Sequence, residues 1–165
     1  MNAAAAPASR IGWKARAAIL AAALWWGSVT AVGFMVVPML FANLPTPAMA
    51  GTMAGKLFSV ESWVAVGCGL VLLFASKAED EGAGLDWRGG ALLFVVSGML
   101  VALLTEFGVA PRILARENLK LWHTIGSAMY VLHWLCAFVV LWKVTGRVES
   151  QQPGAITRGM EGNLE

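Results

Sequence analysis

Charged residues are scarce in this chain of 165 residues, and their scarcity excludes most soluble folds. Asp, Glu, Lys and Arg make up 13% of the sequence, about half the share that is usual in a soluble domain. Hydrophobic residues make up 58%, so too few polar side chains are present to cover the surface of a water-soluble protein. The net charge of +2 is too small to indicate binding to nucleic acid, and we expect no nucleic-acid partner.

Cysteine and histidine are also scarce, with two residues of each. Cys68 and Cys136 both fall inside apolar segments, where thiols act as small packing residues, so the sequence predicts no disulfide framework. His123 and His133 are separated by about 15 Å along one predicted helix. They therefore cannot both bind one iron within a monomer, which excludes a bis-histidine haem.

The sequence lacks the common motifs that carry catalysis or bind cofactors. It has no P-loop, no GxGxxG after a strand, no HExxH, no nucleophile elbow and no pair of ligands at zinc-site spacing. We therefore expect no catalytic residues, no metal site and no cofactor. The absence of these motifs favours a protein that is not an enzyme without deciding the question. Ligation of haem by one histidine and one of the eight methionines, or a haem site shared across a dimer, is left open.

What the sequence does contain is four long apolar runs, at residues 17–42, 58–76, 91–110 and 121–144. About 20 apolar residues in a helix match a hydrocarbon core about 30 Å thick. The pattern predicts an all-α membrane protein, an antiparallel bundle of four transmembrane helices over residues 13–146. Residues 1–12 and 147–165 are polar or small and are predicted to be mobile cytoplasmic tails.

Two boundaries can be predicted more closely. The first apolar run follows a basic segment, but it is longer than the apolar region of a secretory signal, so we interpret it as a retained span. Thr46 followed by Pro47 is typical of a helix N-cap and first helical position, so the second helix should begin well before its apolar run.

The distribution of lysine and arginine predicts the orientation of the spans. One side of the membrane would hold eight basic residues, namely Arg10, Lys14, Arg16, Lys77, Arg88, Lys143, Arg147 and Arg158. The other side would hold four, namely Lys56, Arg112, Arg116 and Lys120. By the positive-inside rule, both termini of this multi-pass protein should lie in the cytoplasm.

Small residues at helical spacing indicate where the spans approach one another. Gly27 and Ala31 form such a pair in the first span, and Gly98 and Ala102 form another in the third. Lipid removes the hydrophobic drive for association between helices, so close approach of backbones at small residues has to contribute.

Several ionisable residues fall at one predicted boundary of the membrane. The second span begins, the third ends and the fourth begins on the side opposite the termini. A candidate polar cluster in the outer leaflet therefore comprises Glu61, Glu106, Arg112, Arg116 and His123. Such a cluster could bind a cation or a proton, or it could neutralise itself as salt bridges in the headgroup region.

His133 forms a second candidate site, near the middle of the fourth span. Ser127 and Tyr130 continue a stripe of small and polar residues toward it, and we expect this stripe to face the interior of the bundle. The imidazole could be a buried hydrogen-bonded side chain, a ligand or a proton carrier.

Four motifs resemble the transmembrane protein 205-like domain family. Gly33-Phe34 with Pro38 and Leu40-Phe41 resembles the end of that family's first span. The segment Ala50-Gly51-Thr52-Met53-Ala54-Gly55 before Leu57-Phe58 is similar to the start of its second span. Pro111-Arg112-Ile113 with Arg116, and His123 with Ser127, resemble the connector and the start of its fourth span. The resemblance covers about residues 15 to 144 and implies a four-span protein of the bacterial inner membrane, with no assigned activity.

Three functions are consistent with these observations. The first is an accessory or assembly subunit that contacts other membrane subunits, or a second copy of itself, within the lipid bilayer. The second is a small oligomeric carrier or proton-coupled transport element that uses the intramembrane glutamate and histidine residues. The third is a haem- or metal-binding redox protein that uses His133 with a methionine.

Overall fold

The computed structural model describes residues 12–77 and 90–150, and every regular element in these two ranges is helical. The elements are α1 (Trp13–Ala31), η1 (Val32–Val36), α2 (Val37–Asn43), α3 (Pro47–Lys77), α4 (Ala91–Leu104), η3 (Thr105–Val109), α5 (Ala110–Leu114) and α6 (Leu119–Ser150). Most of the two predicted tails, residues 1–11 and 151–165, lies outside the described residues. Residues 147–150, which were predicted to belong to the second tail, form the end of α6. The connector between the second and third apolar runs also lies outside them.

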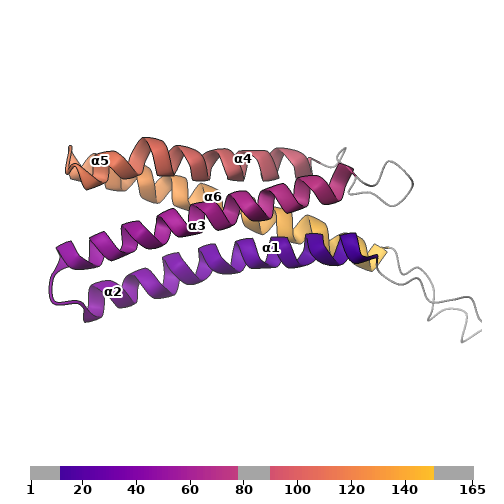
Figure 1. Ribbon diagram of the computed structural model, residues 1–165, viewed down its shortest axis with the longest axis horizontal. Helices are drawn as coiled ribbons and strands as arrows, with labels where there is room; N and C mark the ends of the chain where they lie inside the picture. The colour runs from indigo at the N-terminus through magenta and orange to yellow at the C-terminus, as the bar shows by residue number, and fades with distance from the viewer. Residues whose placement is uncertain (1–11, 78–89, 151–165) are drawn as a thin grey trace, which may run out of the picture.

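The helices form four rods in an antiparallel bundle, which confirms the predicted fold class. α1 packs against α3 and α6, and α4 packs against the same two helices, so the order around the bundle is α1, α3, α4, α6. The connections from α2 to α3 and from α5 to α6 lie at one end of the bundle, while α1 begins and α6 ends at the other (Figure 1).

The two helical hairpins share one plan. In each, a helix runs into a π-helical turn, then into a short α-helix with a proline at its start, and then through a short connection into a long helix. Pro38 follows the end of η1 by two residues, and Pro111 follows the end of η3 by two residues. Proline has no N–H to bond the carbonyl four residues earlier, and its ring crowds that carbonyl. The π turns take up this mismatch, so the first and third rods continue past the prolines.

The connections between helices are short. α3 begins at Pro47, as the Thr46-Pro47 pair predicts, and the hydroxyl of Thr46 accepts a hydrogen bond of 3.3 Å from the backbone N–H of Met49. Between α5 and α6, Arg116 and Asn118 adopt positive φ angles of 56° and 37°. This compact turn lets α6 begin directly beside α5.

The interior of the bundle is built mainly from small residues around one large one. Trp25 is fully buried and lies in a core cluster with alanines of all four rods, including Ala22, Ala65, Ala102 and Ala137. Small side chains let the helix backbones approach closely, as in other membrane bundles.

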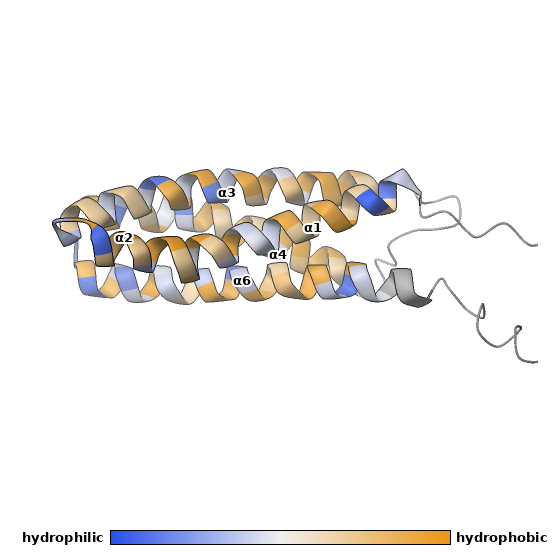
Figure 2. Ribbon diagram, turned by 90° about the horizontal axis from the view of Figure 1, so that it is seen from below, coloured by the Kyte–Doolittle hydropathy of each residue, from blue (hydrophilic) through white to orange (hydrophobic). Residues whose placement is uncertain are grey.

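The outer surface of the bundle is apolar. Leu20, Phe74 and Leu93 are each more than 65% exposed, and hydrophobic residues cover most of the length of the helices (Figure 2). Four helical rods are each long and apolar enough to cross a membrane: Trp13–Asn43, Pro47–Ser76, Ala91–Leu114 and Leu119–Gly146. The chain is therefore a multi-pass membrane protein.

Candidate functional site

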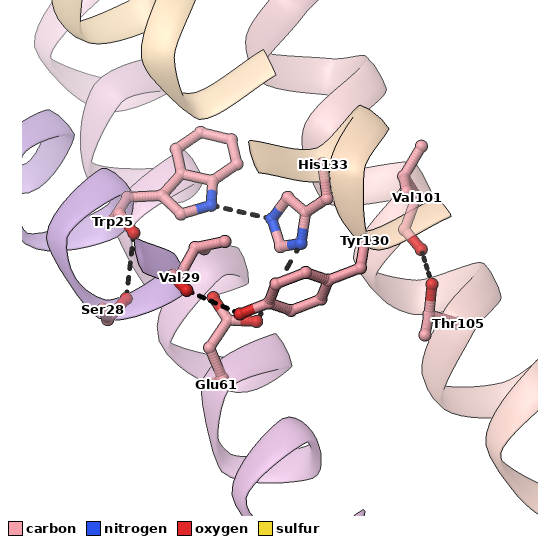
Figure 3. Close-up of polar contacts among 8 residues, drawn as sticks. All are labelled: Trp25, Ser28, Val29, Glu61, Val101, Thr105, Tyr130 and His133. Atoms are coloured by element: carbon pink, nitrogen blue, oxygen red, sulfur yellow. Dashed lines mark hydrogen bonds and ion pairs between the residues drawn. The ribbon is translucent and has the colours of Figure 1, made fainter. Parts of the chain in front are cut away.

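The centre of the bundle holds a buried histidine bonded to a buried tryptophan. The indole Nε1–H of Trp25 on α1 donates a hydrogen bond of 2.8 Å to Nε2 of His133 on α6 (Figure 3). Both side chains are at most 3% exposed. An indole N–H only donates, so Nε2 must be the acceptor and carries no proton. His133 is therefore a neutral imidazole with its proton on Nδ1.

A glutamate completes this site from the helix diagonally opposite α6. Glu61 lies midway along α3, is 4% exposed, and places Oε2 at 3.9 Å from Nδ1 of His133 (Figure 3). That distance is longer than a hydrogen bond. The other oxygen, Oε1, is buried and has no hydrogen-bond partner among the described residues. One carboxyl group thus stands buried beside a neutral histidine with an unused oxygen.

Two further side-chain contacts tie α6 to α1 next to this site. The hydroxyl of Tyr130, one turn before His133, donates a 2.6 Å hydrogen bond to the backbone carbonyl of Val29. The indole N–H of Trp134 donates a 2.9 Å bond to the hydroxyl of Thr30. The Trp25–His133 bond lies in the same interface, so the two helices cannot slide past one another without losing all three bonds.

Two glycines leave room for the rings of the site. A Cβ added to Gly98 of α4 would come within 2.7 Å of Cζ2 of Trp25, and one added to Gly33 of η1 would collide with the ring of Tyr130. The ring of Tyr130 also packs edge-on against Phe58 of α3, with centroids 5.1 Å apart. The orientation of Trp25 and Tyr130 therefore depends on the helices α4 and α3 as well as on α1 and α6.

Glu106 lies apart from this central site and contacts a different residue of α3. Both of its carboxylate oxygens accept hydrogen bonds from the hydroxyl of Ser59, at 2.8 and 2.9 Å. Glu106 belongs to the π turn η3 and is half-buried. Next to this contact, the ring of Phe107 packs edge-on against Trp63 of α3, with centroids 6.4 Å apart.

The structure divides the cluster predicted for the outer leaflet. Glu61 lies beside His133 and Tyr130, while Glu106 lies beside Ser59. The other three members of the cluster, Arg112, Arg116 and His123, have exposed side chains. The side chain of Ser127, from the stripe predicted to lead to His133, is exposed as well. The guanidinium of Arg112 bonds the carbonyl of Gly108 and lies over the ring of Trp122 at 4.5 Å.

The residues described here do not bring three metal-ligating side chains together. No group of three His, Cys, Asp or Glu residues lies close enough to hold a metal ion within residues 12–77 and 90–146. In addition, the lone pair on Nε2 of His133, which a metal or haem iron would need, already accepts the N–H of Trp25. The chemistry that these side chains support directly is the uptake and release of a proton by Glu61.

The hydrogen-bond partners of His133 and Glu106 were not singled out from the sequence. Trp25 falls deep in an apolar run, where a tryptophan is typical of packing, and Ser59 lies outside both sites that the sequence predicts. A tryptophan at the depth of a lone histidine is the signal that could have identified Trp25, since its N–H needs an acceptor when it is buried.

Comparison with known proteins supplies a family for the chain. A family model described as a domain of unknown function (DUF4149) matches residues 20–120. No curated protein and no solved structure matches the chain. The matched segment includes Trp25, Glu61 and Glu106 and ends before His133 and Tyr130.

Proposed function

Because the chain belongs to the DUF4149 family, a domain of unknown function, we propose its role from the chemistry of its own interior: a proton-coupled membrane protein in which Glu61 binds and releases a proton beside His133. One observation carries this proposal. Glu61 is a carboxyl group in the middle of a membrane bundle, 4% exposed, with one oxygen that no described residue bonds. Ionisable groups in such positions are costly, and they usually serve function.

Glu61 is the group of the central site that is free to change its charge. His133 cannot gain a proton on Nε2 while Trp25 donates to that atom, and its Nδ1 already carries one. The hydroxyl of Tyr130 is engaged by the carbonyl of Val29. Addition of a proton to Glu61 converts a buried carboxylate into a neutral carboxylic acid without breaking any of these bonds.

His133 then acts as the polar partner of the charged form. Its Nδ1–H faces Oε2 of Glu61 at 3.9 Å, so a small movement of either side chain would form a charge-assisted hydrogen bond. The same movement reverses when the carboxyl group is protonated. Proton binding is in this way linked to the position of α3 relative to α6, which is the link that a proton-coupled transport element requires.

Difference infrared spectroscopy on the full chain in lipid vesicles tests the proposal. A shift of pH should produce a C=O stretching band from a protonated carboxyl group in the wild-type protein, and Glu61→Gln should remove that band. Glu117→Gln is the matched control, because Glu117 lies exposed in the connection between α5 and α6. Its spectrum should retain the band.

Equal bands in the wild type and in Glu61→Gln, or no band in the wild type, would overturn the proposal. The accessory or assembly role suggested by the sequence would then be the better account. In that case the chain would act only through its apolar surface and its small-residue contacts.

The finer placement of the protein is part of the same proposal. We place it in the bacterial inner membrane with both termini in the cytoplasm, supported by the excess of lysine and arginine on the side of the termini. The identification with the transmembrane protein 205-like family is supported by the motifs around Pro38, Gly51 and Pro111, all of which lie within the matched residues 20–120.

A further inference from the structure

Glu106 lies on a different side of α3 from the central site. Its carboxylate contacts α3 at Ser59, and Ser59 and Glu61 are two residues apart in the chain, which places them about 200° apart around the helix. The contact with Ser59 therefore faces away from the side on which Glu61 meets His133. Trp63 comes four residues after Ser59 and lies on the same face of α3, because residues at this spacing are neighbours on a helix surface.

This face of α3 is part of the outer surface of the bundle. Trp63 is 57% exposed, and Phe107, the residue after Glu106, is 67% exposed. The two rings pack edge-on against each other. Glu106 itself is half-buried, so part of its side chain is accessible at the same surface. The surface thus places a carboxyl group within one helical turn of two exposed aromatic rings.

Along the axis of the bundle, Glu106 lies within the hydrocarbon region. The rod Ala91–Leu114 has 24 residues, which is long enough to cross a membrane. The rod ends eight residues after Glu106, a distance of about 12 Å at about 1.5 Å per residue. Lipid headgroups lie near the ends of such a rod. An ionised Glu106 therefore has to find its counter-charge inside the membrane.

The described residues leave the carboxylate of Glu106 without a counter-charge. The hydroxyl of Ser59 has a single proton, which is shared between the two oxygens at O···O distances of 2.8 and 2.9 Å. No described lysine, arginine or histidine forms an ion pair with Glu106. Since a carboxylate can accept about four hydrogen bonds, most of its capacity for a positively charged ligand is unused.

The composition of this surface selects among cations. A metal ion would need several oxygen ligands, and the part of the chain that the structure describes brings no three metal-ligating side chains together. An organic cation whose charge is surrounded by apolar groups can instead arrive through the lipid. Its charge would pair with the carboxylate, and aromatic rings such as those of Trp63 and Phe107 attract such cations.

We propose that the surface formed by Ser59, Trp63, Glu106 and Phe107 binds a lipophilic organic monocation, of the quaternary ammonium or phosphonium class, that enters from the lipid. The carboxylate of Glu106 supplies the counter-charge, and the hydroxyl of Ser59 orients it. The two aromatic rings contact the apolar groups of the cation. Binding at this surface is non-covalent and does not depend on the proton site at Glu61.

Equilibrium dialysis of tetraphenylphosphonium against the purified full chain in detergent tests this site. The wild type should bind the probe saturably, and Glu106→Gln should weaken binding by about tenfold or more, because opposite charges attract strongly where water is scarce. Glu106→Asp keeps the charge and should bind more tightly than Glu106→Gln. Trp63→Leu should weaken binding by about threefold, within the range found for a cation over an aromatic ring.

Two variants and one ion serve as controls. Trp142→Leu is matched to Trp63→Leu, because Trp142 is also an exposed tryptophan but lies on α6, and it should leave binding unchanged. Glu117→Gln removes an exposed carboxyl group in the connection between α5 and α6, and it should also have no effect. Tetraphenylborate, an anion of the same shape as the probe, should show no saturable binding.

Three results would overturn the cation site: equal affinities in Glu106→Gln and the wild type, equal binding of tetraphenylborate, or no saturable binding by the wild type. In the last case the carboxylate would be left for a basic residue of another membrane helix. Should Glu106→Gln fail to fold, Trp63→Leu and Trp142→Leu decide. Weaker binding in Trp63→Leu alone supports the site, and equal affinities overturn it. The infrared band of Glu61 tests the proton site separately.

Discussion

Gly98 has no side chain, and the ring of Trp25 lies in the space that it leaves. At the residue scale we therefore predict that Gly98→Ala destabilises the bundle by about 1–3 kcal/mol, the usual cost of an overpacked core. The new Cβ would meet Cζ2 of Trp25 at 2.7 Å, and Trp25 is fully buried and cannot move aside freely. The midpoint of thermal unfolding in detergent measures the effect.

Gly27→Ala is the matched control for this substitution. Gly27 is also a glycine inside an apolar helix, but a Cβ at this position would meet nothing within 4 Å. Both substitutions gain the same helix propensity, so the difference between them isolates the contact with Trp25. Equal midpoints for the two variants would show that the Trp25 ring is not held against Gly98.

These two glycines also show how far the sequence can predict individual contacts. Gly27 and Gly98 stand in equivalent small-residue pairs in the sequence, but only Gly98 meets a neighbouring helix closely. Likewise, the depth of His133 was predictable, whereas its partners Trp25 and Glu61 were not. Spacing along a helix gives depth and face, but contacts between helices depend on how the rods are rotated, which one sequence does not determine.

At the scale of the helix, the two prolines produce different backbones from those expected. The apolar runs predict continuous helices, and Pro38 and Pro111 enter the sequence-based prediction only as members of family motifs. Each in fact follows a π turn. A turn of this kind adds one residue to the helical repeat, so it rotates the side chains that follow it relative to those before. The direction in which Glu106 points depends on this rotation.

Substitution of Pro111 tests the origin of the π turn. Pro111→Ala supplies an N–H that can bond the carbonyl of Phe107, so we predict that η3 converts to regular α-helix and that Glu106 turns away from Ser59. Amide hydrogen exchange of residues 105–113 should become slower, because the new bond completes the helix.

Pro47→Ala provides the reference for that measurement. Pro47 is the first residue of α3, where a backbone N–H has no partner within the helix, so the substitution should leave exchange in α3 unchanged. Unaltered exchange around Phe107 in Pro111→Ala would mean that packing against α3 and α6 produces the π turn and that proline does not.

At the scale of the whole molecule, the sequence predicted most of the fold. Four apolar runs with short connectors leave few arrangements other than an antiparallel bundle, because each backbone group must be bonded within its own helix in lipid. α3 and α6 have 31 and 32 residues and extend past their apolar runs, in α3 from the start that the Thr46-Pro47 pair predicts. Polar ends of helices continue into the headgroup region and carry no hydropathy signal.

The orientation of the bundle in the membrane can be measured with single cysteines. Cys68 and Cys136 are buried, so they should not react with a membrane-impermeant maleimide. Glu117→Cys lies in the connection between α5 and α6, and Arg16→Cys lies near the start of α1, at the opposite end of the bundle; both positions are exposed. In intact cells we expect labelling of Glu117→Cys only, and labelling of Arg16→Cys once the membrane is permeabilised. Labelling of Arg16→Cys in intact cells would reverse the orientation.

Each hairpin contributes half of the central polar site. Trp25 and Glu61 come from the first hairpin, and His133 and Tyr130 from the second. A hairpin that inserts alone carries an ionisable or polar group into lipid without its partner, at a cost of about 2.5–3.5 kcal/mol for a charged group. Pairing of the two hairpins in the native register removes this cost, because each polar group then meets its partner. Pairing with another protein or in a shifted register does not. We therefore expect the polar site to favour pairing of the two halves of the chain with each other in the bilayer.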